Sequence, residues 1–195
     1  MTTPIQTSRV RPRAAAAVAG AVLAAATLAA YAHSFGGPFV FDDAPAIRDN
    51  AAIRHWNTAW QLTDGGSPTA GRPLVSLSLA LNYALSGLDV ASYHAVNLII
   101  HLLAALTLFG VVRRTLEGWQ NRASPGAKIA RGVSPTWVAF AAALLWALHP
   151  LQTESVTYLA QRAESLMGLC YLLTLYGFIR YAEADAGGSA PSLRP

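Results

Sequence analysis

Two neighbouring carboxylates, Asp42 and Asp43, end a short segment rich in aromatic residues and glycine, Phe35-Gly-Gly-Pro-Phe-Val-Phe-Asp-Asp43. Adjacent carboxylates beside apolar side chains raise each other's affinity for a proton, because two negative charges repel and are poorly solvated there. Such a pair can act as a general base or bind a cation. The spacing is equally typical of two aspartates in a solvated turn, so both interpretations stay open.

A second polar group recurs at intervals of three and four residues: Tyr93, His94, Asn97 and His101. At about 100° per residue these side chains fall within one arc of a helix. Polar groups inside a membrane are costly and usually face a bundle interior or a wet cavity, so this row should point inward. It can line a cavity, or it can join helices by hydrogen bonds. No zinc site is predicted, because no third and fourth ligands follow at suitable spacing.

A third group lies near residue 160. Glu154, Tyr158, Gln161 and Ser165 are predicted to share one face of a helix, with Arg162 beside them and Glu164 turned away. The Arg162 guanidinium can hold a phosphate through paired hydrogen bonds. It can equally form a structural ion pair with Glu154 or with an aspartate of the 33–91 segment. Arg72, which precedes Pro73, has the same two interpretations.

The elements that position these groups are membrane helices. Of the 195 residues 53% are hydrophobic and 12% charged, and the apolar residues form runs long enough to cross a bilayer. The formal charge of +4 does not indicate nucleic-acid binding, because the basic residues flank apolar runs instead of forming one patch. The single cysteine, Cys170, lies within an apolar run and excludes an internal disulfide. We therefore expect an all-α integral membrane protein.

About four transmembrane helices are predicted, over 14–32, 92–112, 134–149 and 157–179. The first could instead be a signal peptide, since Ala30-Tyr31-Ala32 resembles a cleavage site. The third is short, because Pro150 disfavours helical geometry at His149. A polar N-terminus (1–13), a connecting loop (113–133), a turn (150–156) and a tail (180–195) account for the rest.

The remaining segment, 33–91, is a long polar loop that holds one amphipathic helix at about 72–86. Leu74, Leu77, Leu81 and Leu85 recur at helical spacing, while Ser76, Asn82 and Ser86 lie elsewhere on the helix. This pattern suits a helix resting on the membrane surface. A Ser-rich membrane span is the alternative.

Orientation follows from the basic residues, since cytoplasmic segments retain Lys and Arg. Segments 1–13, 113–133 and 180–195 hold ten of the fourteen: Arg9, Arg11, Arg13, Arg113, Arg114, Arg122, Lys128, Arg131, Arg180 and Arg194. The N-terminus is therefore predicted to be cytoplasmic, in the inner membrane if the source is bacterial. Segments 33–91 and 150–156 are then external, where the acidic residues gather.

Several motifs together resemble a known family: Phe-Val-Phe-Asp-Asp at 39–43, Asn50, Arg72-Pro-Leu, Asn82, Tyr93-His-Ala-Val-Asn-Leu-Ile-Ile-His101, His149-Pro-Leu-Gln-Thr-Glu154 and Gln161-Arg-Ala-Glu164. In this order, and at membrane edges, they are similar to the N-terminal part of the GT-C membrane glycosyltransferases. The likeness is to the transmembrane and tetratricopeptide-repeat O-mannosyltransferases and their bacterial relatives, over roughly 14–182. It implies a partial GT-C fold.

The resemblance also implies a function, the transfer of a sugar from a polyprenyl-phosphate donor to a hydroxyl of a protein or glycan acceptor on the external face. Asp42 or Asp43 would act on the acceptor hydroxyl, and Arg72 or Arg162 would neutralise the lipid phosphate. The cavity would be lined by Tyr93, His94, Asn97, His101, His149, Glu154 and Gln161. No covalently bound cofactor is implied, and a requirement for a divalent metal stays open.

The chain is interpreted as a fragment, because the later membrane helices and the repeat domain of such proteins are absent from it. Its expected partners are the bilayer, the lipid-linked sugar, an acceptor and a separately encoded remainder, but no nucleic acid. Two other functions stay open. Intramembrane His and Asn residues are typical of ion-coupled transporters, and the polar rows could serve a non-catalytic scaffold by joining helices.

Overall fold

The computed structural model describes residues 12–61, 68–122 and 133–187, and every regular element within these ranges is helical. The expected all-α class is confirmed. Five of the basic residues used to predict orientation, Arg9, Arg11, Lys128, Arg131 and Arg194, lie outside the described ranges.

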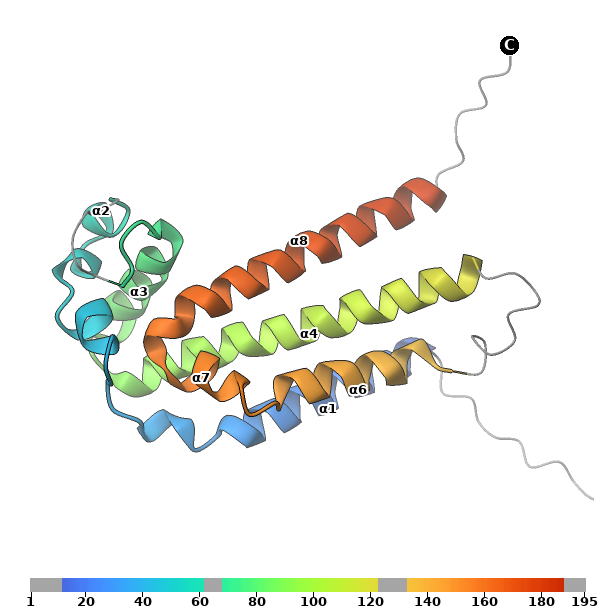
Figure 1. Cartoon of the computed structure of the whole chain (residues 1–195), viewed down its shortest axis with the longest axis horizontal. Coiled ribbons are helices and arrows are strands. Elements are labelled where there is room, and N and C mark those ends of the chain that lie inside the picture. Colours follow the sequence, from blue (N-terminus) through green and yellow to red (C-terminus); the bar gives the residue numbers. More distant parts are fainter. Residues whose placement is uncertain (1–11, 62–67, 123–132, 188–195) are drawn as a thin grey trace, which may run out of the picture.

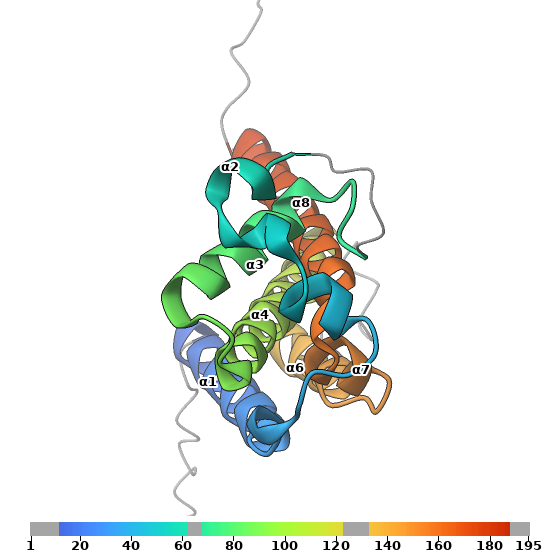
Figure 2. The same ribbon diagram turned by 90° about the vertical axis from the view of Figure 1, so that its left-hand side faces the viewer.

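Four helices run side by side along the length of the molecule (Figure 1): α1 (Pro12–Tyr31), α4 (Val90–Arg122), α6 (Pro135–Ala147) and α8 (Arg162–Gly187). α4 contacts each of the other three. The helices α2 (Trp56–Ala59) and α3 (Pro73–Ser86) gather at one end of the bundle, which faces the viewer in Figure 2. We call this end, with residues 32–61, 68–90 and 148–161, the cap end.

Three helical segments are long and apolar enough to cross a membrane: Arg13–Gly36, Val90–Arg122 and Leu159–Asp185. At 1.5 Å per residue, α4 is roughly 50 Å long and exceeds the hydrocarbon core of a bilayer. The apolar helix α6 has 13 residues and is shorter than that core. Of the four spans expected from the sequence, three are therefore long enough to cross the membrane. The fourth, α6, is too short to cross it by itself.

Small residues bring α1, α4 and α6 together. Ala139, Ala143 and Ala147 recur every fourth residue along α6, and each is fully buried. They pack in one cluster with Ala19 of α1 and Ala105 of α4. Small side chains let helix backbones approach closely, which is the usual way that helices pack within lipid.

The chain between α6 and α8 is broken into short pieces. A six-residue helix, α7 (Gln152–Thr157), is followed by extended backbone at Tyr158 and a 3₁₀ turn, η4 (Leu159–Gln161). The prediction that Glu154, Tyr158, Gln161 and Ser165 share a face of one continuous helix is therefore wrong. Contacts from outside this segment, described below, hold the break in place.

Short turns form the chain between α1 and α2: η1 (Ser34–Gly36), η2 (Ala44–Arg48) and η3 (Ala51–Arg54). Their apolar residues pack on α3 and on the start of α8 in one buried cluster, which includes Ile47, Ile53, Leu79 and Ala163. On α3, Leu74, Leu81 and Leu85 are exposed and available to lipid, whereas Asn82 is buried. The polar face of α3 thus points into the protein instead of toward water.

Residues 31–43 and 147–160 meet at the cap end. The Tyr31 hydroxyl donates to the Ala147 carbonyl over 3.3 Å, joining the ends of α1 and α6. The Asp42 amide donates to the Tyr158 hydroxyl over 3.1 Å. The segments that contain the aspartate pair and His149 therefore emerge at the same end of the bundle, as a common site requires.

Candidate functional site

The two aspartates have different environments. Asp43 is completely buried, and its carboxylate accepts hydrogen bonds from the Val40 amide (3.1 Å) and the Ala160 amide (2.7 Å). The second bond satisfies a free N–H at the start of the helical run that leads into α8, where a negative charge is favourable. Asp43 thereby joins the first loop to the broken segment before α8.

Burial sets the protonation of this carboxyl. It raises the pKa of Asp43 above its usual value, because the charged form is poorly solvated, while the two amide hydrogen bonds oppose the rise. The positive charge of a protonated His94 would lower the same pKa. Asp43 is a structural acceptor in this arrangement, with neither oxygen left open toward the surface.

Asp42 lies on the surface beside it. The preceding residue, Phe41, has a φ of 44°, a left-handed conformation that is uncommon for a bulky residue and is often found near functional sites. This turn directs Asp43 inward and leaves Asp42 exposed. Burial, together with the negative charges of Asp42 and Asp43, raises the pKa of the Tyr158 phenol, which therefore stays protonated beside Asp42.

The approach of the first loop to α4 is close. The Gly37 carbonyl pairs with Nε2 of His94 over 3.3 Å, and a Cβ atom added at Gly37 would lie 3.2 Å from the same nitrogen. Glycine at this position lets the Gly-Gly-Pro turn pack against the buried imidazole. This packing also positions the aspartate pair, which follows the Gly-Gly-Pro turn in the sequence.

Arg162 is fully buried at the start of α8. Its guanidinium donates to Asn97 Oδ1 (2.8 Å), Asn82 Oδ1 (2.9 Å) and the Tyr93 carbonyl (3.1 Å), with a longer bond of 3.4 Å to the Ser78 carbonyl. It also lies over the Tyr93 ring, 5.5 Å from its centroid. These contacts connect α3, α4 and α8 through one side chain.

This environment matches neither of the two interpretations of Arg162 drawn from the sequence. Among the described residues, neither Glu154 nor an aspartate of the 33–91 segment forms an ion pair with Arg162; Asp64 lies outside the described ranges. Glu154 is exposed and accepts from Gln161 over 3.4 Å. A phosphate cannot reach the guanidinium in this structure, because protein acceptors enclose it. Within the part of the chain that the structure describes, the partners of the Arg162 cation are dipoles and an aromatic face.

The polar row on α4 points inward, as predicted. Tyr93, His94, Asn97 and His101 are all buried. His101 pairs with the Ala147 carbonyl over 3.0 Å and stacks on Trp146 with 5.1 Å between the ring centroids. His94, Asn97 and His101 thus each bind a neighbouring segment of the chain, as polar groups that join helices do.

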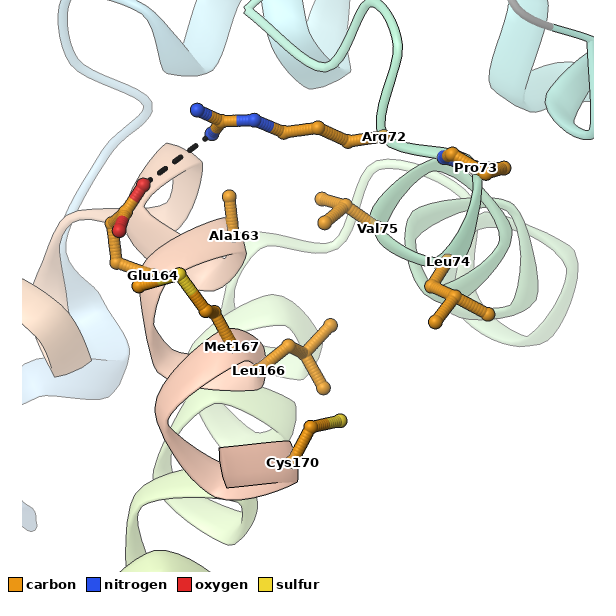
Figure 3. A pocket seen from close by; sticks show the side chains of 9 residues that line it. All are labelled: Arg72, Pro73, Leu74, Val75, Ala163, Glu164, Leu166, Met167 and Cys170. Atoms are coloured by element: carbon orange, nitrogen blue, oxygen red, sulfur yellow. Dashed lines mark ion pairs between the residues drawn. The ribbon is translucent and has the colours of Figure 1, made fainter. Parts of the chain in front are cut away.

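An apolar groove of about 390 Å³ lies between α3 and α8. Figure 3 shows Arg72 and Glu164 at one end of it and the apolar side chains of Leu74, Met167 and Cys170 beyond them. Arg72 Nη1 and Glu164 Oε1 are 3.5 Å apart, and about half of each side chain is exposed. We call this pair the groove mouth.

The groove mouth and the aspartate pair share one end of α8. Asp43 binds the amide of Ala160, and Glu164 follows only four residues later, roughly one helical turn. The exposed Asp42 and the exposed guanidinium of Arg72 at the groove mouth therefore both lie toward the cap end of the bundle.

Comparisons with known proteins find similar sequences among protein O-mannosyl-transferases. The mouse protein O-mannosyl-transferase TMTC1 is 35% identical over 191 residues, which cover 91% of this chain and 19% of the mouse protein. The Drosophila melanogaster protein O-mannosyl-transferase Tmtc3 is 33% identical and the human TMTC4 protein 29% identical, covering 85% and 88% of this chain and 19% and 24% of theirs.

The chain resembles the TMTC-type protein O-mannosyl-transferases. It spans about a fifth of the length of these relatives. No protein-family model matches the chain, and no solved structure matches it. With three helices of membrane-crossing length and TMTC-type relatives, the chain is an integral membrane protein.

The seven residues predicted to line the cavity differ in burial. Tyr93, His94, Asn97 and His101 are buried between helices. His149 and Glu154 are exposed, and His149 accepts the Leu151 amide through Nδ1 over 3.2 Å, which stabilises the turn after α6. Gln161 is half-buried. None of these seven residues lines the groove that Arg72 lines.

The sequence analysis missed the roles of three residues at this site. Glu164 was placed away from the polar row, yet it forms the groove mouth with Arg72. Asn82 was treated as a surface residue, and Tyr158 as one member of a row. The available signal for Asn82 was that it is the one amide side chain of α3, whose other polar residues are serines and a tyrosine. Among the described residues, no group of three or more His, Cys, Asp or Glu side chains could hold a metal.

Proposed function

We propose that this chain forms the donor-binding and acceptor-activating part of a membrane glycosyltransferase that transfers a sugar to a protein hydroxyl. The names of its relatives, protein O-mannosyl-transferases, indicate that the sugar is mannose. The observation that carries the proposal is the apolar groove with an exposed guanidinium at its mouth. An exposed carboxylate, Asp42, lies at the same end of the bundle. Apolar lining suits a polyprenyl chain, and a guanidinium at its end suits the phosphate.

Arg72 is the residue that we assign to the donor phosphate. About half of its side chain is exposed, and its ion pair with Glu164 is a surface pair, which contributes little stability and exchanges readily. A phosphate can therefore replace the carboxylate at this guanidinium. Positive charge there stabilises the phosphate as it leaves the anomeric carbon.

Asp42 is the residue that we assign to the acceptor. Its carboxylate takes the proton of the acceptor hydroxyl as the oxygen forms a bond to the anomeric carbon. The bond between that carbon and the phosphate oxygen breaks, and the electron pair stays with the phosphate. Asp43 positions Asp42 by fixing the loop to the start of α8.

The cap end is proposed to face the non-cytoplasmic side. The described basic residues at the opposite end, Arg113, Arg114, Arg122 and Arg180, support this orientation, because cytoplasmic ends of membrane helices retain Lys and Arg. The lipid phosphate then lies at the external surface with its sugar near Asp42.

The test uses Cys170, the only cysteine of the chain, which lines the groove. In membranes that contain the chain, a polyprenyl phosphate should slow the reaction of Cys170 with a membrane-permeant maleimide, and the unphosphorylated polyprenol should protect much less. Arg72→Gln should weaken protection about tenfold, the usual scale for a charge-assisted contact.

The matched control is Arg48→Gln, because Arg48 is a similarly exposed arginine paired with Asp49 away from the groove. It should leave protection unchanged. Equal protection by the phosphate and the polyprenol, or equal weakening by both substitutions, would rule out the phosphate site.

A further inference from the structure

Glu164 shares the groove mouth with the guanidinium that we assign to the donor phosphate. Its Oε1 lies 3.5 Å from Arg72 Nη1, and Figure 3 shows the two side chains reaching toward each other from α8 and from the start of α3. Among the described residues, no other Lys or Arg lines this groove. A bound phosphate must therefore sit beside the Glu164 carboxylate as well as beside Arg72.

The charge at the mouth consequently depends on the ligand. With Arg72 and Glu164 ionised, the two side chains sum to zero. A sugar phosphodiester carries one negative charge, whereas a phosphate monoester carries close to two above pH 7, because its second pKa is about 6. Each added negative charge is repelled by Glu164, since like charges a few ångströms apart disfavour one another.

Sugar transfer changes this charge. The donor is a phosphodiester, and breaking its bond to the anomeric carbon leaves the lipid as a phosphate monoester that keeps the oxygen and the electron pair. The hydroxyl proton passes to Asp42 and then to solvent. The lipid thus gains one negative charge at the mouth during the reaction.

We propose that Glu164 makes the groove select the phosphodiester donor over the phosphate monoester product, by repelling the additional negative charge, so that the spent lipid leaves. This inference rests on the proposed function, and it assigns to Glu164 a role in specificity. If Glu164 only held Arg72 in place, its loss would instead weaken the binding of both lipids equally.

The experiment compares two ligands in the chain and in Glu164→Gln. Protection of Cys170 is titrated at pH 8 with a polyprenyl phosphate and with the same lipid carrying mannose on the phosphate. Wild type should prefer the diester. In Glu164→Gln this preference should fall about fivefold, the scale of one like-charge contact near a surface, and neither lipid should bind more weakly than before.

Two controls fix the cause. Glu117→Gln removes a half-exposed carboxylate that pairs with Arg113 near the opposite end of α4, and it should leave the preference unchanged. At pH 5 the monoester takes up its second proton and carries the same charge as the diester, so the wild-type preference should shrink.

The outcomes separate the two proposals. If neither lipid protects Cys170 in the wild-type chain, the donor site itself is wrong. If both lipids protect but Glu164→Gln leaves their ratio unchanged, or weakens both equally, the phosphate site stands and selection by Glu164 is refuted.

Discussion

Asp42 and Asp43 are adjacent in the chain but face in opposite directions, one to the surface and one into the cap. Asp42→Asn should abolish sugar transfer and change the free energy of unfolding by less than about 0.5 kcal/mol, because an exposed side chain is replaced. Asp43→Asn should destabilise the protein by about 1–3 kcal/mol, because an amide nitrogen would then face a buried N–H donor. Transfer assays and denaturation in detergent measure both effects; normal transfer by Asp42→Asn would exclude its role as base.

The buried carboxyl of Asp43 also predicts a pH dependence. Its pKa in the folded protein is raised above the usual 3.8, so the folded state binds this proton more tightly than the unfolded state does. The stability contributed by this group is complete below pH 3.8 and is lost as the pH rises through the raised pKa. We therefore expect the free energy of unfolding of the wild type to fall relative to that of Asp43→Asn as the pH rises from 3.5 to 7. A difference between the two proteins that does not change with pH would contradict this prediction.

Arg162 is a buried cation with four hydrogen-bond acceptors around it. Arg162→Gln should cost about 3–5 kcal/mol, because it leaves several buried acceptors without donors. Arg162→Lys should restore part of this loss, since one ammonium cannot reach both Asn82 and Asn97. Thermal unfolding in detergent measures the effect, with Arg180→Gln as the control on an exposed arginine of the same helix. Equal stability of the two Gln variants would show that Arg162 is not structural.

At the scale of elements, small residues set how closely α6 approaches α1 and α4. Ala143→Leu should destabilise the protein by about 1–3 kcal/mol, because the added carbons enter a filled interface. Ala141→Leu makes the same change at an exposed position two residues earlier and should be neutral. Thermal unfolding of both variants decides the matter. If Ala141→Leu proves the more damaging, the described face of α6 is not its packed face.

The break before α8 shows how an element's end can depend on a distant residue. Hydropathy predicted one helix over 157–179. Most of this segment is helical, but Tyr158 is extended and α8 begins only at Arg162. Asp43 binds the Ala160 amide from 117 positions away in the sequence. Hydropathy reports which residues prefer lipid, and it contains no term for such a contact.

For the whole molecule, the structure predicts that the segments at 41 and 151 emerge on one face of the membrane. In a Cys170→Ser background, Phe41→Cys and Leu151→Cys should react with a membrane-impermeant maleimide from the external side. Trp119→Cys, at the other end of α4 and also exposed, should react only after permeabilisation. Labelling of positions 41 and 151 from opposite sides would exclude a site shared by the two segments.

Much of the architecture followed from local pattern. The apolar runs and the helical period placed the long helices, and the cost of polar groups in lipid predicted that Tyr93, His94, Asn97 and His101 point inward. These inferences need only the chemistry of each side chain and its neighbours in the sequence.

The choice among chemically equivalent residues was decided by the tertiary structure alone. The sequence offered two aspartates and two arginines for the same roles. Packing buries Asp43 and Arg162 among backbone and amide partners, and it leaves Asp42 exposed at the cap end and Arg72 exposed at the groove mouth. Burial and hydrogen bonding depend on segments that are far apart in the chain, so the residues available for chemistry can be identified only once those segments have met.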